Sequence, residues 1–387
     1  MPHSRSLRGD ALQFPVLSER IFLNHAYVSP LPSAAARAMV EYAETTSRRP
    51  SQPDAYRRAG AFRARAAELI HASPDEIAAV PNTTTGLGLI AHGLDWSRGG
   101  AVVTTAIEFP ANRYPWEALQ RRHGVRFVAV EPEADGRINF DFVITAMRDS
   151  FVDGRTNLLT VSHAQFSTGQ LAPVAVLADE AHRLGGFVAL DAIQTIGLLP
   201  FNPSDLGVDF AAADGHKWML GPEGAGIFYC RKDLIDTLEP MIAGWLSMTK
   251  PFDFLEYRFE YREGARRYEP GCWNVAGLTG LAASLELLLE VGEDAIWSSV
   301  REMTACIREE AARAGWREDP VLRPEEQSGI VTLRPGGTKV RLDLLERAMS
   351  DRGVDVAVRG GRLRLSPHFY NTIEQIEEAF RILRSVT

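Results

Sequence analysis

A lysine and a carboxylate stand at the ends of two apolar segments of this sequence. Lys217 follows an apolar stretch within residues 213–220, and Asp191 ends another apolar run upstream. An amine and a carboxylate at the ends of neighbouring buried strands suit an aldehyde cofactor with a basic ring nitrogen. The lysine forms a Schiff base with the aldehyde, and the carboxylate keeps the ring nitrogen protonated. The pair therefore predicts pyridoxal phosphate (PLP) as cofactor, with Lys217 and Asp191 as catalytic residues.

Each of these residues also has an ordinary structural explanation. Most loop lysines are simply solvated, although Gly215 and Gly221-Pro222 constrain this loop and favour a functional Lys217. Asp191 could be the N-cap of the following segment, with Gln194 as its capping-box partner. In the functional interpretation, which Lys217 favours, Asp191 pairs with the ring nitrogen and Gln194 hydrogen-bonds the ring hydroxyl.

A threonine-rich turn, residues 81–86, follows a short apolar run and opens an apolar helix expected at residues 87–94. Backbone N–H groups at a helix N-terminus, together with the hydroxyls of Thr83 and Thr84, form a cradle for a phosphate. An ordinary threonine N-cap would have the same sequence. The segment Gly86–Ala91 also fits the spacing of a dinucleotide fingerprint, which leaves a nicotinamide-dependent oxidoreductase as a weaker alternative.

Two further residues are candidates for ligand contacts. Phe109 follows a predicted strand, where an aromatic ring can stack on a flat cofactor, although a core position is equally compatible. Arg364 lies in an alternating segment, 362–366, where it would clamp a substrate carboxylate through two hydrogen bonds or simply face solvent.

Short apolar runs alternate with helix-length amphipathic segments, such as 114–122 and 173–184. The predicted strands are Ile77–Val80, Ala101–Thr105, Arg126–Val130, Leu158–Val161, Phe187–Leu190, Phe210–Ala213 and Gly226–Cys230. This alternation predicts an α/β fold with a mostly parallel seven-stranded sheet covered on both faces. Only about a dozen residues separate the last two strands, which is too few for a crossover helix, so the last strand should run antiparallel. Lys217 would then lie on a loop over the sheet, where α/β folds place their ligands.

The rest of the chain has a mixed α+β pattern. We expect helices at 278–291, 297–314, 342–352 and 373–384, and strands at 329–333, 354–358 and 362–366. The predicted division is a large PLP-binding domain of residues 22–290 and a small domain formed by residues 1–21 with 291–387.

Composition limits the class of protein. The chain has 387 residues, 45% hydrophobic content and a net charge of −8, so it can bury a large core and a nucleic-acid partner is not expected. Its three cysteines fit neither a disulfide framework nor a metal site. With no apolar signal core and no membrane span expected, we predict a cytoplasmic protein.

These residues together resemble the class V aminotransferase family of fold-type I PLP enzymes, which includes cysteine desulfurases, kynureninases and isopenicillin N epimerase-like proteins. The resemblance covers nearly the whole chain, and its most specific part is Asp191 with Gln194 followed by Gly215-His216-Lys217. It implies that Thr83, Thr84 and His216 hold the phosphate and that Phe109 stacks on the ring.

The resemblance also implies how substrate and a second subunit take part. Arg364 would bind the substrate α-carboxylate, and Asn24 and His25 are expected to contribute to substrate binding. Family members are homodimers with active sites built from both subunits. Trp245, Cys272 and Trp273 are candidates for residues that reach the neighbouring site, although the tryptophans fit an ordinary core equally well.

Three positions depart from the family pattern. Asp214 stands where desulfurases have a phosphate-binding serine, so its carboxylate must point elsewhere, be protonated or act through water. Cys272 replaces a threonine that usually reaches the partner subunit's phosphate, and a thiol is a weak donor. Residues 358–364 form a tight turn where desulfurases carry a loop with a persulfide cysteine.

We therefore expect a PLP-dependent enzyme that deprotonates an α-amino acid at Cα, with Lys217 as the base. The favoured outcome is β-elimination by a C–S lyase acting on an S-substituted cysteine. An aminotransferase, an epimerase and a decarboxylation-coupled deaminase remain alternatives, and a non-catalytic PLP-binding scaffold is a weaker one.

Overall fold

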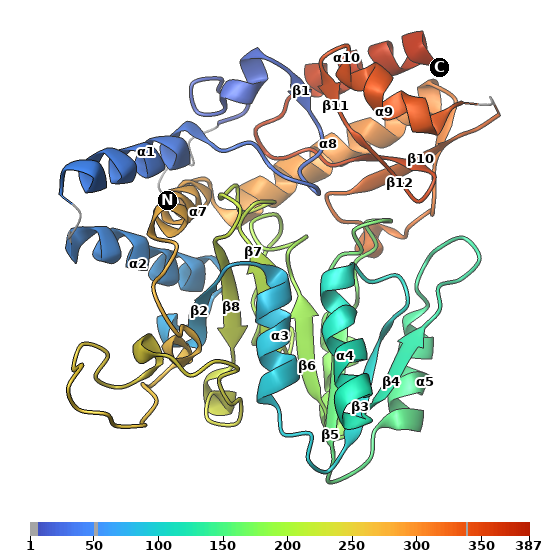
Figure 1. The fold of residues 1–387 in the computed structure, drawn as a ribbon. Coiled ribbons are helices and arrows are strands. Elements are labelled where there is room, and N and C mark those ends of the chain that lie inside the picture. The colour runs from blue at the N-terminus through green and yellow to red at the C-terminus, as the bar shows by residue number, and fades with distance from the viewer. Residues whose placement is uncertain (1–6, 50–52, 338–339) are drawn as a thin grey trace.

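A seven-stranded sheet forms the centre of the computed structural model, which describes residues 7–49, 53–337 and 340–387 (Figure 1). The order across the sheet is β2-β8-β7-β6-β5-β3-β4. Its strands are β2 (Ile77–Val80), β3 (Gly100–Thr105), β4 (Arg126–Val130), β5 (Thr156–Ser162), β6 (Phe187–Asp191), β7 (Phe210–Asp214) and β8 (Gly226–Cys230). Only β8 runs against its neighbours, because the short link from β7 leaves no room for a helix. The predicted α/β fold with one antiparallel strand is confirmed.

Helices cover both faces of this sheet, and successive side chains of a strand belong to different faces. In β6, Val188 and Leu190 pack on the face covered by α2 (Pro53–Leu69), α5 (Phe140–Ser150), α6 (Val174–Arg183) and α7 (Val275–Val291). Ala189 packs on the opposite face, under α3 (Thr83–Gly93) and α4 (Tyr114–His123). Because both faces are buried, the strands have continuous apolar sequences.

Helix α3 approaches the sheet closely at its first turn. A Cβ built on Gly86 would lie 2.6 Å from the Cβ of Ala212 in β7. Both Gly86 and Gly88 lie inside α3 and not in the turn before it. The glycines therefore permit helix–sheet packing and do not form the turn of a dinucleotide fingerprint, so the nicotinamide alternative loses its motif.

The C-terminal part of the chain packs above the carboxyl ends of the parallel strands (Figure 1). Its helices are α8 (Glu293–Arg313), α9 (Leu342–Ser350) and α10 (Ile373–Val386), around a four-stranded antiparallel sheet of order β12-β13-β10-β9. The strands are β9 (Trp316–Glu318), β10 (Val331–Pro335), β12 (Ala357–Arg359) and β13 (Arg362–Leu365). Leu23 joins the hydrophobic core of this part, and β1 (Ile21–Phe22) pairs with β11 (Val354–Asp355). The domain boundary near residue 291 stays a prediction.

Several expected elements differ in extent from those observed. The predicted strand 354–358 is two strands, β11 and β12, which belong to different sheets. Helices α7 and α8 begin earlier than expected, and Gly292 with φ 85° separates them. Helices α1 (Ser33–Arg48) and α2, which both pack on α7, were not predicted.

Within the described ranges, no single helix is long and apolar enough to span a membrane, and α7 with α8 would pass only as a pair bent by 82°.

Candidate active site

Most of the predicted site residues line one cavity of about 300 Å³. The cavity lies where β6 and β7 end, beside the N-terminus of α3 and the β12–β13 hairpin. These residues are Thr83, Thr84, Phe109, Asp191, Asp214, His216, Lys217 and Arg364. They come from widely separated parts of the chain. The parallel topology brings all of them except Arg364 together, because strand ends meet at one edge of the sheet, and Arg364 comes from β13 of the antiparallel sheet.

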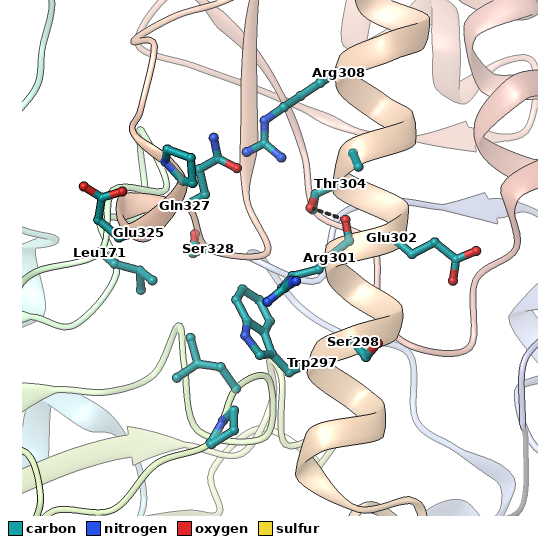
Figure 2. Close-up of a pocket in the computed structure, with 14 residues that line it drawn as sticks. Leu171, Trp297, Ser298, Arg301, Glu302, Thr304, Arg308, Glu325, Gln327 and Ser328 are labelled. Atoms are coloured by element: carbon teal, nitrogen blue, oxygen red, sulfur yellow. Dashed lines mark hydrogen bonds between the residues drawn. The ribbon is translucent and has the colours of Figure 1, made fainter.

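A larger cavity, of about 880 Å³, lies between α8 and the segment 324–328 (Figure 2). Trp297, Arg301 and Arg308 point into it from α8. None of the predicted site residues lines this cavity. The smaller cavity is therefore the candidate active site, because titratable groups converge on it. The greater volume of the other cavity does not make it the site.

Lys217 and Asp191 share the buried floor of the smaller cavity. The Lys217 side chain is 7% exposed, and its Nζ lies 5.5 Å from the centroid of the Phe109 ring. Burial lowers the pKa of Lys217 below its ordinary value, although the nearby Asp191 carboxylate opposes this shift. Burial likewise raises the pKa of Asp191, and the Lys217 amine opposes it. The pair therefore combines a lysine that loses its proton readily with a carboxylate that lacks a full counter-charge.

The Asp191 carboxylate is oriented by its own loop. Its Oδ1 accepts a hydrogen bond from the Ile193 N–H at 3.1 Å. Among the residues that the structure describes, no donor reaches Oδ2. Phe109 and Ile193 both line the cavity and supply its apolar walls. A flat ring with a protonated nitrogen toward Asp191 fits this arrangement.

The N-terminus of α3 forms the opposite end of the cavity. Asn82 caps the helix through the Thr85 N–H at 2.8 Å, and Thr83 Oγ1 accepts the Asp214 N–H at 3.0 Å. The Thr83 hydroxyl hydrogen thus remains available to an anion. Unpaired N–H groups and a hydroxyl at a helix N-terminus bind phosphate.

The unusual Asp214 is turned onto its own loop. One carboxylate oxygen accepts the Gly215 N–H at 2.7 Å, and the other lies 2.9 Å from Nδ1 of His216. The carboxylate is therefore turned toward its own loop at the phosphate-binding end, and its contact with Nδ1 of His216 does not have hydrogen-bond geometry.

Arg364 is a buried cation that has no carboxylate partner among the described residues. Its side chain is 2% exposed, Nη1 donates to the Phe166 carbonyl at 2.7 Å, and Nη2 reaches Asn24 Oδ1 at 3.4 Å. The buried Nε of Arg364 has no hydrogen-bond partner among the residues that the structure describes. Burial lowers the pKa of Arg364 to about 10. An unsatisfied buried guanidinium is costly, and a substrate carboxylate would relieve that cost.

Gln194 and Asn24 are near the site but do not line it. Gln194 donates to the Ala26 carbonyl at 3.1 Å and accepts from Trp218 Nε1 at 2.8 Å, which leaves one amide hydrogen for the predicted ring-hydroxyl contact. Asn24 contacts Arg364 and does not line the cavity, so its role in substrate binding stays a prediction.

The structure does not place His25 in the cavity. The ring is fully buried, with Nδ1 at 2.8 Å from the Ser366 carbonyl and Nε2 at 2.6 Å from the Tyr370 hydroxyl. Both nitrogens are thus engaged within the core, and the predicted direct substrate contact is wrong for this residue. The family resemblance aligned His25 by its position in the sequence, and this position does not determine the direction of the His25 side chain.

Cys272 and the two tryptophans lie outside the cavity of their own chain. Cys272 is exposed, and Trp245 is 39% exposed. Trp273 donates to Glu269 Oε2 at 3.1 Å within the same chain. A contact of any of the three with an active site would require a second subunit.

Sequence reasoning missed several residues at this site. Arg359 and Tyr27 line the cavity. Glu108 supports the loop of Phe109: it is buried and accepts hydrogen bonds from Thr105, Asn112 and Ser162. The signal for Glu108 was available, since a carboxylate directly after an apolar strand needs several donors when buried.

The β12–β13 hairpin confirms the predicted tight turn. Gly360 and Gly361 have φ values of 57° and 71°, the left-handed pair that a two-residue hairpin turn requires. All three cysteines of the chain are described, and none lines the cavity. Burial raises the pKa of Cys230 to about 12 and that of Cys306 to about 11, so neither is a reactive thiolate.

The fold and the lysine–carboxylate pair over a helix N-terminus define a fold-type I PLP-dependent enzyme. Comparison with known proteins agrees: residues 21–379 match the family described as Aminotransferase class-V. The chain belongs to the class V aminotransferase family, whose cofactor is PLP. No cluster of metal-ligating side chains was found in the described part of the chain.

Relatives in this family have different activities. A probable cysteine desulfurase of Methanothermobacter thermautotrophicus is 29% identical over 384 residues, which cover 94% of each chain. The isopenicillin N epimerase of Streptomyces clavuligerus is 30% identical over 333 residues, covering 83% of this chain and 82% of the epimerase. The solved complex of the cystine C–S lyase C-DES with cysteine persulfide has a TM-score of 0.87 at 22% identity, covering 97% of this chain and 100% of that one.

Proposed function

We propose that this enzyme cleaves the carbon–sulfur bond of an S-substituted cysteine by β-elimination. The observation that carries the proposal is the absence of any cysteine from the lining of the cavity, together with the tight turn at Gly360-Gly361. Without a thiol beside the substrate, the sulfur must leave on the substrate's own fragment. A desulfurase relative and a C–S lyase of the same fold support carbon–sulfur chemistry.

The residues of the cavity have separate tasks in this reaction. Arg364 binds the α-carboxylate and orients the substrate, and the neutral Lys217 amine accepts the Cα proton. Bound PLP supplies an electron sink for the pair left at Cα. The Cβ–S bond then breaks with its electron pair on sulfur, so that one water is consumed and the products are a thiol, pyruvate and ammonium.

Product analysis tests this proposal. The purified PLP-loaded enzyme should release thiol and pyruvate in equal amounts from S-substituted cysteines. Lys217→Ala should abolish release and remove the near-visible absorbance band, whereas Lys232→Ala, at an exposed position, should retain both. Absence of both products, with Cα hydrogen exchange still present, would overturn the proposal.

Epimerisation is the second candidate, because the epimerase relative covers most of the chain. It would return a proton to Cα on the face opposite Lys217. Tyr27 is a lining residue with a hydroxyl proton, whereas Phe109 has none to give. Racemisation of an amino acid without loss of its side chain would favour this reaction, and keto-acid formation with an intact side chain would favour transamination.

We also propose that the enzyme is a homodimer. Residues 241–259, here called the aromatic loop, expose Phe252, Phe254, Leu255, Tyr257 and Phe259 by 65–97%. Apolar exposure on this scale is typical of a protein–protein interface.

Because the three cysteines of the chain are unpaired, we also propose a reducing, cytoplasmic location.

A further inference from the structure

The active-site cavity holds a second arginine, to which the family resemblance assigned no role. Arg359 ends β12 and lines the cavity together with Lys217 and Arg364. In the hairpin register, Arg364 lies opposite Ala357, two residues before Arg359 on the same strand. Residues i and i+2 of a strand share a face, so the two arginines are diagonal neighbours whose side-chain stems begin about 7 Å apart.

The groups around Arg359 do not neutralise it. Its Nη1 donates to the Val358 carbonyl at 2.7 Å and lies 3.6 Å from Glu346 Oε2. That oxygen already accepts the Val358 N–H at 2.8 Å, and Glu346 is 44% exposed. A long, solvated ion pair of this kind contributes little. On its other side, the guanidinium lies 5.7 Å from the centroid of the Tyr27 ring, which is 57% exposed.

The carboxylates that line the cavity do not pair with either arginine. Asp191 lies beside Lys217, and Asp214 is bonded to Gly215 and faces His216. Glu223 is exposed, and no ion pair joins it to Arg359 or Arg364 among the described residues. Two cations on one face of a hairpin repel each other unless anions bind both.

We propose that Arg359 binds an anionic group at the side-chain end of the substrate, which makes the substrate class an S-substituted cysteine whose substituent carries a carboxylate. This inference rests on the proposed carbon–sulfur cleavage. Arg364, at the buried end of the cavity, takes the α-carboxylate. Arg359, with a side chain 35% exposed near the opening, takes the second one. The exposed end of the cavity thereby selects the leaving group.

A matched pair of substrates isolates this contact. S-(2-carboxyethyl)-L-cysteine and S-(2-carbamoylethyl)-L-cysteine have nearly the same shape and differ in the charge of the terminal group. The wild-type enzyme should prefer the carboxylate in kcat/KM by about tenfold to a hundredfold, as expected for one charge-assisted hydrogen-bonded contact. Arg359→Gln should lower kcat/KM for the carboxylate far more than for the amide, and so remove this preference. Arg347→Gln, at an exposed position of α9, is the control and should keep the preference.

The results that overturn the inference differ from those that overturn carbon–sulfur cleavage. Equal kcat/KM values for the two compounds in the wild type would contradict a role of Arg359 in side-chain recognition. An equal loss for both compounds in Arg359→Gln would assign it to the shared α-carboxylate instead. If neither compound releases pyruvate, their equilibrium binding, followed by the cofactor absorbance, still reports the charge preference. A preference in binding without cleavage would then reject the reaction and retain the role of Arg359.

Discussion

At the scale of single residues, the site depends on which charges are left without a counter-charge. Burial shifts the pKa values of Asp191 and Lys217, and the charge of each residue opposes the shift of the other. Arg364 is buried, and its Nε has no hydrogen-bond partner among the described residues. A protonated ring nitrogen would supply the counter-charge for Asp191, and a carboxylate would supply the counter-charge for Arg364. We therefore expect PLP and the amino group of the substrate at Lys217, with the α-carboxylate toward Arg364.

Asp191→Asn tests the first of these charges. An amide cannot balance a protonated ring nitrogen, and removal of one partner of a buried ion pair costs about 3–5 kcal/mol. We expect the variant to retain bound PLP through the α3 N-terminus while Cα hydrogen exchange falls by about a hundredfold or more. Exchange of the Cα hydrogen for deuterium measures this directly. Wild-type exchange rates in the variant would remove Asp191 from the mechanism.

The sequence predicted that these residues lie together where a strand or helix end determined their direction, and their roles stay predictions. Lys217, Asp191, Thr83 and Phe109 each follow a strand of the sheet, so topology alone brings them to one edge. His25 and Gln194 could not be placed in the same way, because partners distant in sequence, Tyr370 and Trp218, set their orientations. Arg359 was not predicted, because the turn at Gly360-Gly361 was interpreted only as the place where a persulfide cysteine is absent.

At the scale of secondary-structure elements, the approach of α3 to β7 positions the phosphate cradle. Gly86→Ala would put a methyl group 2.6 Å from the Ala212 Cβ. We expect it to destabilise the protein by about 1–3 kcal/mol through overpacking, and to weaken PLP binding because α3 carries Thr83. Denaturant unfolding and PLP titration are the two measurements.

Gly88→Ala is the matched control in the same helix. Its nearest neighbour would be the Met241 sulfur at 4.0 Å, so the new methyl group has room. Alanine favours a helix over glycine by up to about 1 kcal/mol, and the variant should be neutral or more stable. Equal destabilisation by the two substitutions would show that the close packing of α3 is not the cause.

The elements themselves were predicted unequally. The seven strands of the sheet are buried on both faces and bounded by turns, so their positions were correct within a few residues. The separation of β11 from β12 was missed because one short segment, in which Val354, Val356 and Val358 alternate with other residues, contributes to two sheets. The start of α7 at Val275 depends on an Asn274 cap that hydrogen-bonds the Gly277 N–H.

At the scale of the whole molecule, the aromatic loop predicts a second subunit. Leu255→Asp should convert the dimer to a monomer, because it places a charge in each of two symmetry-related apolar contacts. Leu12→Asp is the control, since Leu12 is 90% exposed outside the loop. Analytical ultracentrifugation measures the mass. A wild-type monomer, or a dimer unaffected by the Leu255 substitution, would contradict this assignment of the interface.

Buried histidines make stability depend on pH. Burial lowers the pKa of His163 and of His368 from 6.5 to about 4. Between these values the unfolded chain binds a proton on each histidine and the folded chain does not. The free energy of unfolding is thus fully retained above pH 6.5 and falls as pH decreases toward 4, by about 1.4 kcal/mol per unit for each residue.

Denaturant unfolding at several pH values measures this slope. His163→Gln should reduce the slope between pH 6.5 and 5, whereas His123→Gln, at an exposed position, should leave it unchanged. An unchanged slope in the His163 variant would show that this residue is not the source.

We propose that the sulfur leaves on a fragment of the substrate and is not transferred to a cysteine of the enzyme. A cysteine-free variant, Cys230→Ala with Cys272→Ser and Cys306→Ala, tests it most directly. With S-(2-carboxyethyl)-L-cysteine, the folded, PLP-loaded variant should release thiol and pyruvate in equal amounts at nearly the wild-type rate. If Cys272→Ser alone abolishes release while PLP stays bound, a cysteine takes part in sulfur transfer and the account is contradicted.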